Sequence, residues 1–350
     1  MGNPFTLSFG KIPLQYISRI EDTSKVVDTF NAVEPSNQIF MISGVRGSGK
    51  TVLMTSISKE LLKDDRWVTI ELNITRDILL GFASKLYALK GMHRIFINAK
   101  IDLSLFGIDA SIEKAVPAND IETAITDMLE LCKKQGKRIL VNIDEATNSE
   151  YIRQFSYAFQ IFLRQDLPVF LIMTGLYENI YNLQNDKSLT FLYRTPKIML
   201  EPLNINAIAD KYANIFGVDK KNAYKMALLT KGYPFAFQVM GYLYYENGGD
   251  IDGLLTKYDQ YLEEYVYDKI WMELSSLDKK VMITISSTSK NKVKDIREEL
   301  GMNPSQFSVY RDRLIRKGLI KSGEYGTVEL TLPRFEAFVN KRKYIMDMEI

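Results

Sequence analysis

The octet GVRGSGKT, residues 44–51, follows the apolar run at residues 39–42 and precedes apolar residues at helical spacing. It matches the phosphate-binding pattern G-x-x-x-x-G-K-[ST] at every fixed position, and it lies between a strand and a helix, as such a loop requires. Glycines let the backbone curl so that its N–H groups point inward around an anion, and the helix adds its positive N-terminal end. The octet therefore predicts a phosphate-binding loop rather than a chance glycine-rich turn.

Two residues at the end of this loop have side chains suited to contact a nucleotide and its metal ion. Lys50 is placed to reach the β- and γ-phosphates of a nucleotide, and the Thr51 hydroxyl is placed to ligate Mg²⁺. We therefore expect ATP or ADP and magnesium as cofactors. The residues expected to line the nucleotide at this loop are Gly44, Val45, Arg46, Gly47, Ser48, Gly49, Lys50, Thr51 and Val52.

A nucleotide site of this kind also needs an acidic residue after another central strand. The stretch RILVNIDEA supplies Asp144 and Glu145 directly after an apolar run. Asp144 would orient Mg²⁺, mostly through a bound water, and Glu145 would act as general base on the attacking water. A solvated helix start would also explain an Asp-Glu pair here, but the upstream loop favours the catalytic interpretation.

Two further residues are candidates for catalysis. Thr174 ends the apolar stretch PVFLIMTG, where its hydroxyl could touch the γ-phosphate or position the water; the alternative is a helix N-cap. Arg194, in FLYRTPKIML, precedes the last expected strand. It could supply positive charge to the transition state, in its own subunit or a neighbouring one. The alternative for Arg194 is a structural ion pair.

Hydrophobic patterning predicts an α/β fold. Strands alternate with helices along the first part of the chain, which implies a mostly parallel sheet covered on both faces. Residues 100–112, which alternate about Gly107, favour a β-hairpin. The expected strands are residues 39–43, 67–72, 138–143 and 169–173, and the expected helices are residues 51–62, 77–89, 121–134 and 149–164.

The pattern changes twice after the last strand candidate. Residues 205–270 are predicted to be helical, with breaks at Gly217, at KGYP and at NGGD. From residue 275 the order becomes helix, helix, turn, helix and hairpin, which is typical of a winged helix. We therefore expect a P-loop ATPase core at residues 1–204, a helical lid at residues 205–272 and a winged-helix domain at residues 273–350.

Composition limits the classes of function. The 350 residues carry a formal net charge of +2, so no strong overall field attracts the protein to nucleic acid or to a membrane. The single cysteine, Cys132, excludes an intramolecular disulfide, and the single histidine, His93, argues against a histidine-rich metal site. The N-terminal residues do not resemble a signal peptide, and no apolar stretch is long enough for a membrane span. We expect a cytoplasmic protein without a membrane partner.

With these motifs in place, the chain resembles the bacterial and archaeal AAA+ and STAND-type ATPases related to origin-recognition proteins. The resemblance covers nearly the whole chain and is strongest at GVRGSGKT and LVNIDEA. It is supported by NPFTLSFGKIPLQYISR, LIMTG, LYRTPKIMLEPL and GYPFAFQVMGYLYY. It implies that the segment ending at Arg19 contacts adenine, so that Tyr16, Ile17 and Arg19 become candidate base contacts. It also implies that the region of Pro234, in the GYP motif, touches the nucleotide.

One departure from the family pattern concerns the lid. Many AAA+ proteins carry an arginine on the lid helix that senses the γ-phosphate, whereas GYPFAFQVMGYLYY contains none. The resemblance then implies slow hydrolysis and a nucleotide-gated switch rather than an engine for mechanical work.

The C-terminal module gives a candidate interface for double-stranded DNA. Between Lys290 and Lys321 the sequence has nine basic and four acidic residues. A recognition helix at residues 304–317 would enter the major groove. The side chains expected to meet bases or phosphates are Gln306, Ser308, Tyr310, Arg311 and Arg313.

Three functions remain open from the sequence. The first is an ATPase switch whose winged helix binds DNA, and the second is a STAND-type signalling or defence ATPase whose winged helix docks a protein partner. A P-loop kinase is the third, and it ranks last because the Asp144-Glu145 pair suits hydrolysis. Assembly into a homo-oligomer is compatible with the first two.

Overall fold

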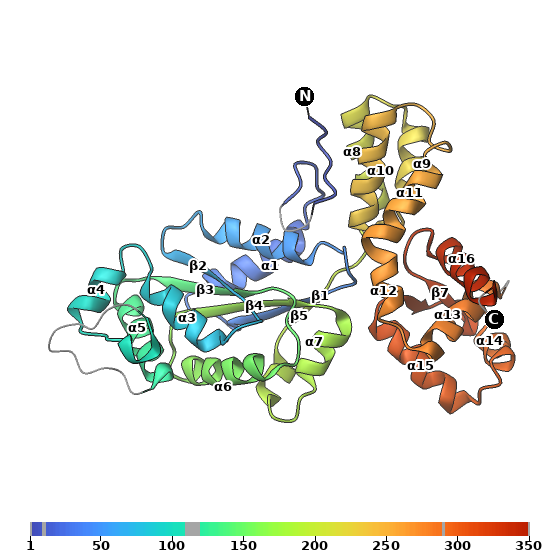
Figure 1. Cartoon of the computed structure of the whole chain (residues 1–350). Helices are drawn as coiled ribbons and strands as arrows, with labels where there is room; N and C mark the ends of the chain where they lie inside the picture. The colour runs from blue at the N-terminus through green and yellow to red at the C-terminus, as the bar shows by residue number, and fades with distance from the viewer. Residues whose placement is uncertain (1, 9–11, 109–119, 289–290, 349–350) are drawn as a thin grey trace. The chain divides into compact units, whose positions relative to one another are not determined.

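The structure, a computed structural model, describes residues 2–8, 12–108, 120–288 and 291–348 (Figure 1). Contacts divide the chain into two compact units. The sheet unit contains Arg19–Ser43 and Lys50–Met199, and the helical unit contains Met1–Ser18, Gly44–Gly49 and Leu200–Ile350. The octet is therefore divided between the units: residues 44–49 group with the helical unit, and residues 50 and 51 group with the sheet unit. The three-domain boundaries expected from the sequence remain a prediction.

The sheet unit is built on a five-stranded parallel sheet in the order β2-β3-β4-β1-β5. This confirms the predicted α/β class. Strands β1, β3 and β4 are almost wholly buried, as expected for parallel strands covered on both faces. The strands are β1 (Ile39–Ser43), β2 (Trp67–Leu72), β3 (Arg138–Ile143), β4 (Val169–Gly175) and β5 (Lys197–Met199).

Helices cover both faces of this sheet (Figure 1). Side chains alternate across a strand, so Phe40 of β1 packs on Phe30 of α1 while Met41 joins the apolar cluster of α3, α5 and α6. Asp77, Asp120 and Ser149 cap the N-termini of those three helices. The helices of the unit are α1 (Ile20–Asn31), α2 (Lys50–Leu61), α3 (Ile78–Tyr87), α4 (His93–Asn98), α5 (Ile121–Lys134), α6 (Glu150–Arg164) and α7 (Tyr177–Gln184).

The hairpin expected at residues 100–112 is wrong over its described part. Residues 100–108 form no strand and contain the 3-10 turn η1 (Ser104–Phe106); residues 109–112 lie outside the described residues. The buried Asp102 carboxylate accepts a hydrogen bond from the Ser104 N–H at 2.8 Å, and Gly107 ends the turn in the left-handed conformation. This local side-chain bond gives the backbone an alternative to a strand ladder.

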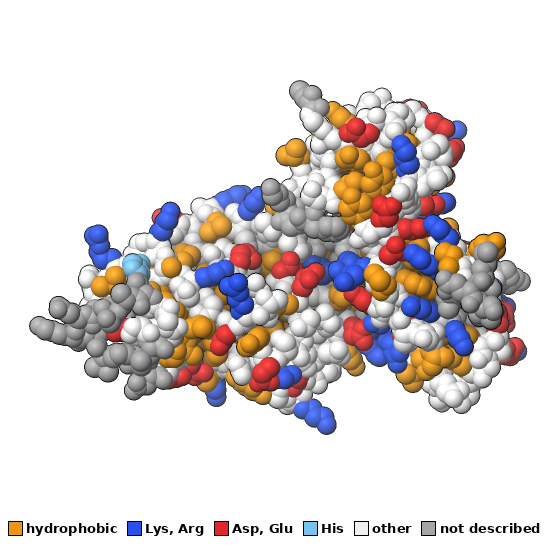
Figure 2. Space-filling view, in the orientation of Figure 1, with side chains coloured by type: hydrophobic (Ala, Val, Ile, Leu, Met, Phe, Trp, Pro, Cys, Tyr) orange, Lys and Arg blue, Asp and Glu red, His pale blue; other side chains and the backbone are white. Residues whose placement is uncertain are grey.

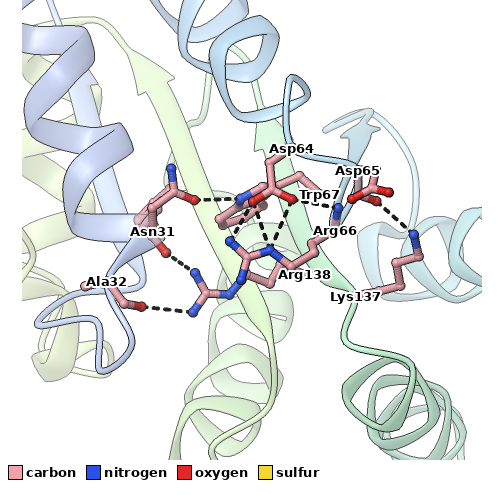
Figure 3. Close-up of polar contacts among 9 residues, drawn as sticks. Asn31, Ala32, Asp64, Asp65, Arg66, Trp67, Lys137 and Arg138 are labelled. Carbon is pink, nitrogen blue, oxygen red and sulfur yellow. Dashed lines mark hydrogen bonds and ion pairs between the residues drawn. The ribbon is translucent and has the colours of Figure 1, made fainter.

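Arg138 secures the amino-terminal edge of the sheet (Figure 3). Its guanidinium donates hydrogen bonds to the carbonyls of Phe30 and Ala32, at the end of α1, at 2.6 and 3.0 Å. It also lies 5.5 Å from the ring centroid of Trp67 and 5.3 Å from that of Phe170. A cation at the C-terminus of a helix is favourable, because the unpaired carbonyls there carry partial negative charge. Burial lowers the pKa of Arg138 from its usual value.

The helical unit has one continuous apolar core. Phe5, from the N-terminal segment, packs against Tyr212, Phe216 and Phe237 of the lid helices. The first group of elements is α8 (Ile205–Phe216), α9 (Lys220–Leu229), α10 (Pro234–Asn247), α11 (Leu255–Leu262), the π-helix η3 (Glu263–Tyr267) and α12 (Asp268–Met272). None of the helices within the described ranges combines the length and apolarity needed to cross a membrane.

The C-terminal elements follow the order expected from the sequence: three helices and then an antiparallel hairpin. Leu314 is wholly buried, and Tyr310 and Ile315 are partly buried against the same core, so Tyr310, expected to meet DNA, lies partly on the inward side of the third helix. The elements are α13 (Ser276–Ser287), α14 (Val293–Glu299), α15 (Pro304–Arg316), β6 (Ile320–Ser322), η4 (Glu324–Gly326), β7 (Val328–Leu330) and α16 (Phe335–Met348).

The turn before α10 requires glycine at position 232. Gly232 has φ +74°, and a Cβ there would collide with the Leu203 carbonyl and lie 2.8 Å from the Pro202 Cβ. Its own carbonyl accepts the Leu203 N–H at 2.7 Å. The turn is therefore fixed against the backbone at residues 202–203.

We expect Gly232→Ala to lower the free energy of unfolding by about 2–5 kcal/mol, because left-handed strain adds to the collision with backbone. Gly217→Ala is the matched control, since Gly217 has φ +65° with nothing near its Cβ position, and we expect a loss of about 1 kcal/mol. Denaturant unfolding measures both variants. Equal losses in the two would contradict this account of the turn.

Candidate functional site

Three sequence-predicted residues meet at the carboxyl edge of the sheet unit. Thr51 lies in the first turn of α2, Asp144 follows β3, and Thr174 lies near the end of β4. The Asp144 carboxylate accepts a hydrogen bond from Thr51 Oγ1 at 2.8 Å, and its other oxygen accepts one from Thr174 Oγ1. Ligands of open α/β sheets bind at this edge. Thr174 thus contacts Asp144 directly, and in this structure it is a strand residue rather than a helix N-cap.

Glu145 occupies an unusual backbone conformation beside this cluster. Its φ is +55°, in the left-handed region that glycine favours, and its side chain is exposed. The Glu145 N–H is held by Asp144 Oδ1 at 3.0 Å and by Thr174 Oγ1 at 3.3 Å. Residues with such backbone strain cluster at functional sites, where the surroundings stabilise the conformation.

Beneath Asp144 lies a polar network that the sequence analysis missed. Asn142 is wholly buried, and its amide donates hydrogen bonds at 2.7 Å to Ser58 Oγ on α2 and to Glu71 Oε1 on β2. Burial raises the pKa of Glu71; the hydrogen bond from Asn142 lowers it, and the charge of Asp144 raises it again. The network ties α2, which begins with Lys50, to β3, the strand that directly precedes Asp144. The signal in the sequence that could have predicted this network is the asparagine inside the apolar run LVNI.

The first part of the octet is held by the lid turn. The Tyr233 hydroxyl donates a hydrogen bond to the Arg46 carbonyl, and the Phe235 N–H donates one to the Gly47 carbonyl at 3.2 Å. Burial raises the pKa of Tyr233 far above its usual value, so the phenol stays a donor. Arg46 also forms an ion pair with Glu273 at 3.1 Å. We call Tyr233, Pro234 and Phe235 the lid clasp.

The loop has features that suit an anion. Gly47 and Gly49 have φ values of +74° and +90°, conformations that let successive N–H groups face one side. The Ser48 hydroxyl is buried and has no hydrogen-bond partner within the described part of the chain. A phosphate group, with several acceptor oxygens, would satisfy that hydroxyl.

The donor set also fits magnesium. Hydroxyl and carboxylate oxygens such as those of Thr51 and Asp144 are its preferred ligands, and Mg²⁺ usually takes only one or two carboxylates from the protein. Among the described residues no group of three or more His, Cys, Asp or Glu side chains could hold a metal ion by itself. Nucleotide oxygens would complete such a site.

The remaining candidate nucleotide contacts lie in the N-terminal segment, at the start of α10 and in α2. Pro234 begins α10, and its Cβ is 3.9 Å from the position of a Cβ on Gly49. Gln238 fixes the N-terminal segment by donating to the Gln15 carbonyl at 2.6 Å, and Ile17 packs on the core of the helical unit, as does Val45. Tyr16 lies in the same segment. Arg19 belongs to the sheet unit, 4.0 Å from Asp22, and Val52 is half-buried in α2. Adenine contact by these residues remains a prediction.

Arg194 ends the 3-10 helix η2 (Thr190–Arg194), directly before β5. Its side chain is exposed, and so is the neighbouring Tyr193, with a relative exposure of 70%. An exposed arginine beside an exposed tyrosine suits contact with another subunit.

On α15 several predicted DNA contacts have partners within the module. Arg313 pairs with the buried Asp278 at 3.2 Å and lies over the Tyr310 ring. Gln306 forms a capping box with Asn303. The predicted set is completed by Ser308, which donates to Asp312 at 3.5 Å, and by Arg311, which pairs with the same carboxylate at 3.5 Å.

Two solved structures are similar to this chain over most of its length. A Walker-type ATPase of Pyrococcus abyssi matches with a TM-score of 0.65 at 16% identity, over 93% of this chain and 95% of that chain. The Aeropyrum pernix ORC2 protein in its ADPNP-ADP complexes matches with a TM-score of 0.64 at 12% identity, over 98% of both chains. This chain has the fold of ORC-like P-loop ATPases.

A second comparison concerns the C-terminal part alone. A family model described as a domain of unknown function (DUF8462) matches residues 264–339, from the π-helix η3 into α16. A search of curated proteins found no match.

The first test of the site is Lys50→Ala. We expect loss of ATP binding with the fold retained, because the substitution removes the charge that meets the phosphates and leaves the apolar faces of α2 intact. Titration calorimetry with ATP and a thermal melt measure the two effects. Lys59→Ala, on the same helix, is the control and should bind as wild type. Unchanged ATP affinity in folded Lys50→Ala would exclude the phosphate-binding role.

Proposed function

We propose that the protein binds ATP and hydrolyses it slowly, as a nucleotide-dependent switch. The observation that carries this proposal is the hydrogen bonding of Asp144 to both Thr51 and Thr174, which joins the end of the octet to the ends of two central strands. Lys50 would hold the β- and γ-phosphates, and Ser48 would donate its unpartnered hydroxyl. Magnesium, when bound through Thr51 and Asp144, would neutralise the charge that develops on the phosphates.

Glu145 is proposed as the general base. The two hydrogen bonds to its N–H fix the backbone beside Asp144, and its exposed carboxylate can reach solvent water. The carboxylate would accept a proton from the water that attacks the γ-phosphate, and the product ADP would retain the released electron pair on its β-phosphate oxygen. Thr174 would hold Asp144 in position during this step.

Glu145→Gln should retain ATP binding and slow hydrolysis by roughly 100-fold or more, because the amide cannot accept the proton. Phosphate release under single-turnover conditions measures the step directly. Glu150→Gln, five residues along and exposed, should hydrolyse ATP as wild type does. Hydrolysis by Glu145→Gln at the wild-type rate would assign the base elsewhere.

Slow turnover is supported by the make-up of the lid clasp. Helix α10 contains no arginine. Tyr233, directly before the helix, and Phe235, in its first turn, contact the octet through hydrogen bonds to the Arg46 and Gly47 carbonyls. Such bonds depend on the conformation of the loop backbone and bring no charge to a transition state. A lid built this way suits detection of the loop's conformation better than acceleration of hydrolysis.

Arg194 is proposed to act in a neighbouring subunit of a homo-oligomer. Arg194→Ala should then lower hydrolysis while sparing ATP binding, since the residue would meet the phosphates only across an interface. Mixing Arg194→Ala with Glu145→Gln should restore part of the activity, because some mixed interfaces combine an intact Arg194 with an intact Glu145. Lys197→Ala, close by and also exposed, is the control. If mixtures that co-assemble stay inactive, the role in a neighbouring subunit is wrong.

We further infer that α13, α14, α15 and the β6–β7 hairpin form a winged helix that binds double-stranded DNA. The local excess of basic residues supports this, as do exposed cations such as Lys292 and Lys294. Arg311 is half-exposed and remains the best candidate on α15. Arg313 is better regarded as structural, because its guanidinium neutralises the buried Asp278. Docking of a protein partner is the competing role.

Arg311→Glu combined with Lys292→Glu should weaken binding of a fluorescent DNA duplex and flatten its salt dependence by about two ions, since two phosphate contacts are lost. Reversal of Arg313 is avoided, because it would place two carboxylates together and unfold the module. Lys63→Glu, in the sheet unit, is the charge-matched control for a single reversal. If wild type shows no salt-sensitive duplex binding with either ATP or ADP, the module docks protein.

A further inference from the structure

Four aromatic rings follow one another across the lid helices. The ring centroids of Phe235 and Tyr265 are 5.9 Å apart, those of Tyr265 and Tyr261 are 5.9 Å apart and nearly parallel, and those of Tyr261 and Tyr242 are 6.3 Å apart. Phe235 and Tyr242 belong to α10, Tyr261 to α11 and Tyr265 to the π-helix η3. We call this row the tyrosine face.

The face reaches the surface at its tyrosines. Tyr265 has a relative exposure of 40%, and Tyr242 and Tyr261 are half-buried, whereas Phe235 is buried at the lid clasp. Figure 2 shows hydrophobic side chains, a class that includes tyrosine, gathered on the surface of the lid helices with acidic side chains beside them. Tyrosines that expose a ring and a hydroxyl together are enriched in protein interfaces, because they bury apolar area and still satisfy their polar end.

Two carboxylates border the face. Glu246 accepts a hydrogen bond from Asn3 at 2.9 Å, and Glu264 accepts one from Gln260 at 2.8 Å. Both donors are neutral amides, which orient the two carboxylates without neutralising their charge. Burial raises the pKa of Tyr261, and the neighbouring phenols and the charges of Glu264 and Glu246 raise it further. The surface presents π-electrons and negative charge together.

We propose that the tyrosine face binds an extended, arginine-rich segment of a protein partner. A guanidinium stacks on a tyrosine ring and is attracted to its negative face, and it pairs with a carboxylate at the rim. The exposed Tyr265 and the half-buried Tyr261 and Tyr242 offer aromatic contacts along the row, which suits an extended chain rather than a single cation. Single-stranded nucleic acid would also stack on such rings, but its phosphates would face Glu246 and Glu264.

This proposal rests on contacts inside the helical unit and needs no ATP turnover. The probe is a fluorescein-labelled decapeptide of alternating arginine and proline, titrated with the full chain and followed by anisotropy at about physiological ionic strength. We expect saturable binding that Tyr265→Ala weakens by about tenfold, because one stacking position is lost. Glu246→Gln with Glu264→Gln should weaken binding and reduce its dependence on salt, with no loss of the aromatic surface.

Tyr181→Ala is the matched control, since Tyr181 has a relative exposure of 42% but lies on α7 in the sheet unit. Thermal melts of all variants establish that they fold. The proposal is overturned if the peptide shows no saturable binding, or if folded Tyr265→Ala and the double glutamine variant both bind it as wild type does. It is also overturned if a ten-nucleotide thymidine strand binds more tightly than the peptide with the same dependence on Tyr265.

Discussion

The carboxylate of Asp144 is the group on which the sheet unit's edge depends. It accepts hydroxyl hydrogen bonds from Thr51 and from Thr174, and it faces the N–H of Glu145 as well. This one carboxylate thus fixes the start of α2 relative to β3 and β4. Two residues earlier in the chain, the buried Asn142 adds hydrogen bonds to α2 and to β2. Because a charged acceptor makes stronger hydrogen bonds than a neutral one, these contacts stabilise the edge of the sheet.

The helical unit organises the other part of the octet by different means. Its contacts to residues 46 and 47 go to backbone carbonyls, so they constrain the direction of the peptide groups rather than any side chain. Tyr233 is buried, and burial raises the pKa of its phenol far above the usual value, so the hydroxyl stays a donor. Gly47 leaves room for the tyrosine hydroxyl, since a Cβ at that position would collide with it. Sequence positions 47 and 233 therefore depend on each other.

Local sequence patterns predicted much of this structure. Apolar runs gave β1, β2, β3 and β4, and the octet with the Asp144-Glu145 pair marked the candidate site, because such signals are confined to a few neighbouring residues. The hairpin at 100–112 failed where an Asx-type bond at Asp102 competed with a strand. Partners distant in sequence were not predictable. Asn142 with Ser58 and Arg313 with Asp278 pair only after the elements pack.

The two ends of β3 carry different kinds of contact. At its first residue, Arg138 caps the C-terminal end of α1 and faces two aromatic rings, contacts that stabilise the fold. Past its last residue, Asp144 and the strained Glu145 have geometry that folding alone does not require. A substitution at the Arg138 end would therefore change contacts with α1 and the aromatic rings, at the opposite end of the strand from Asp144 and Glu145.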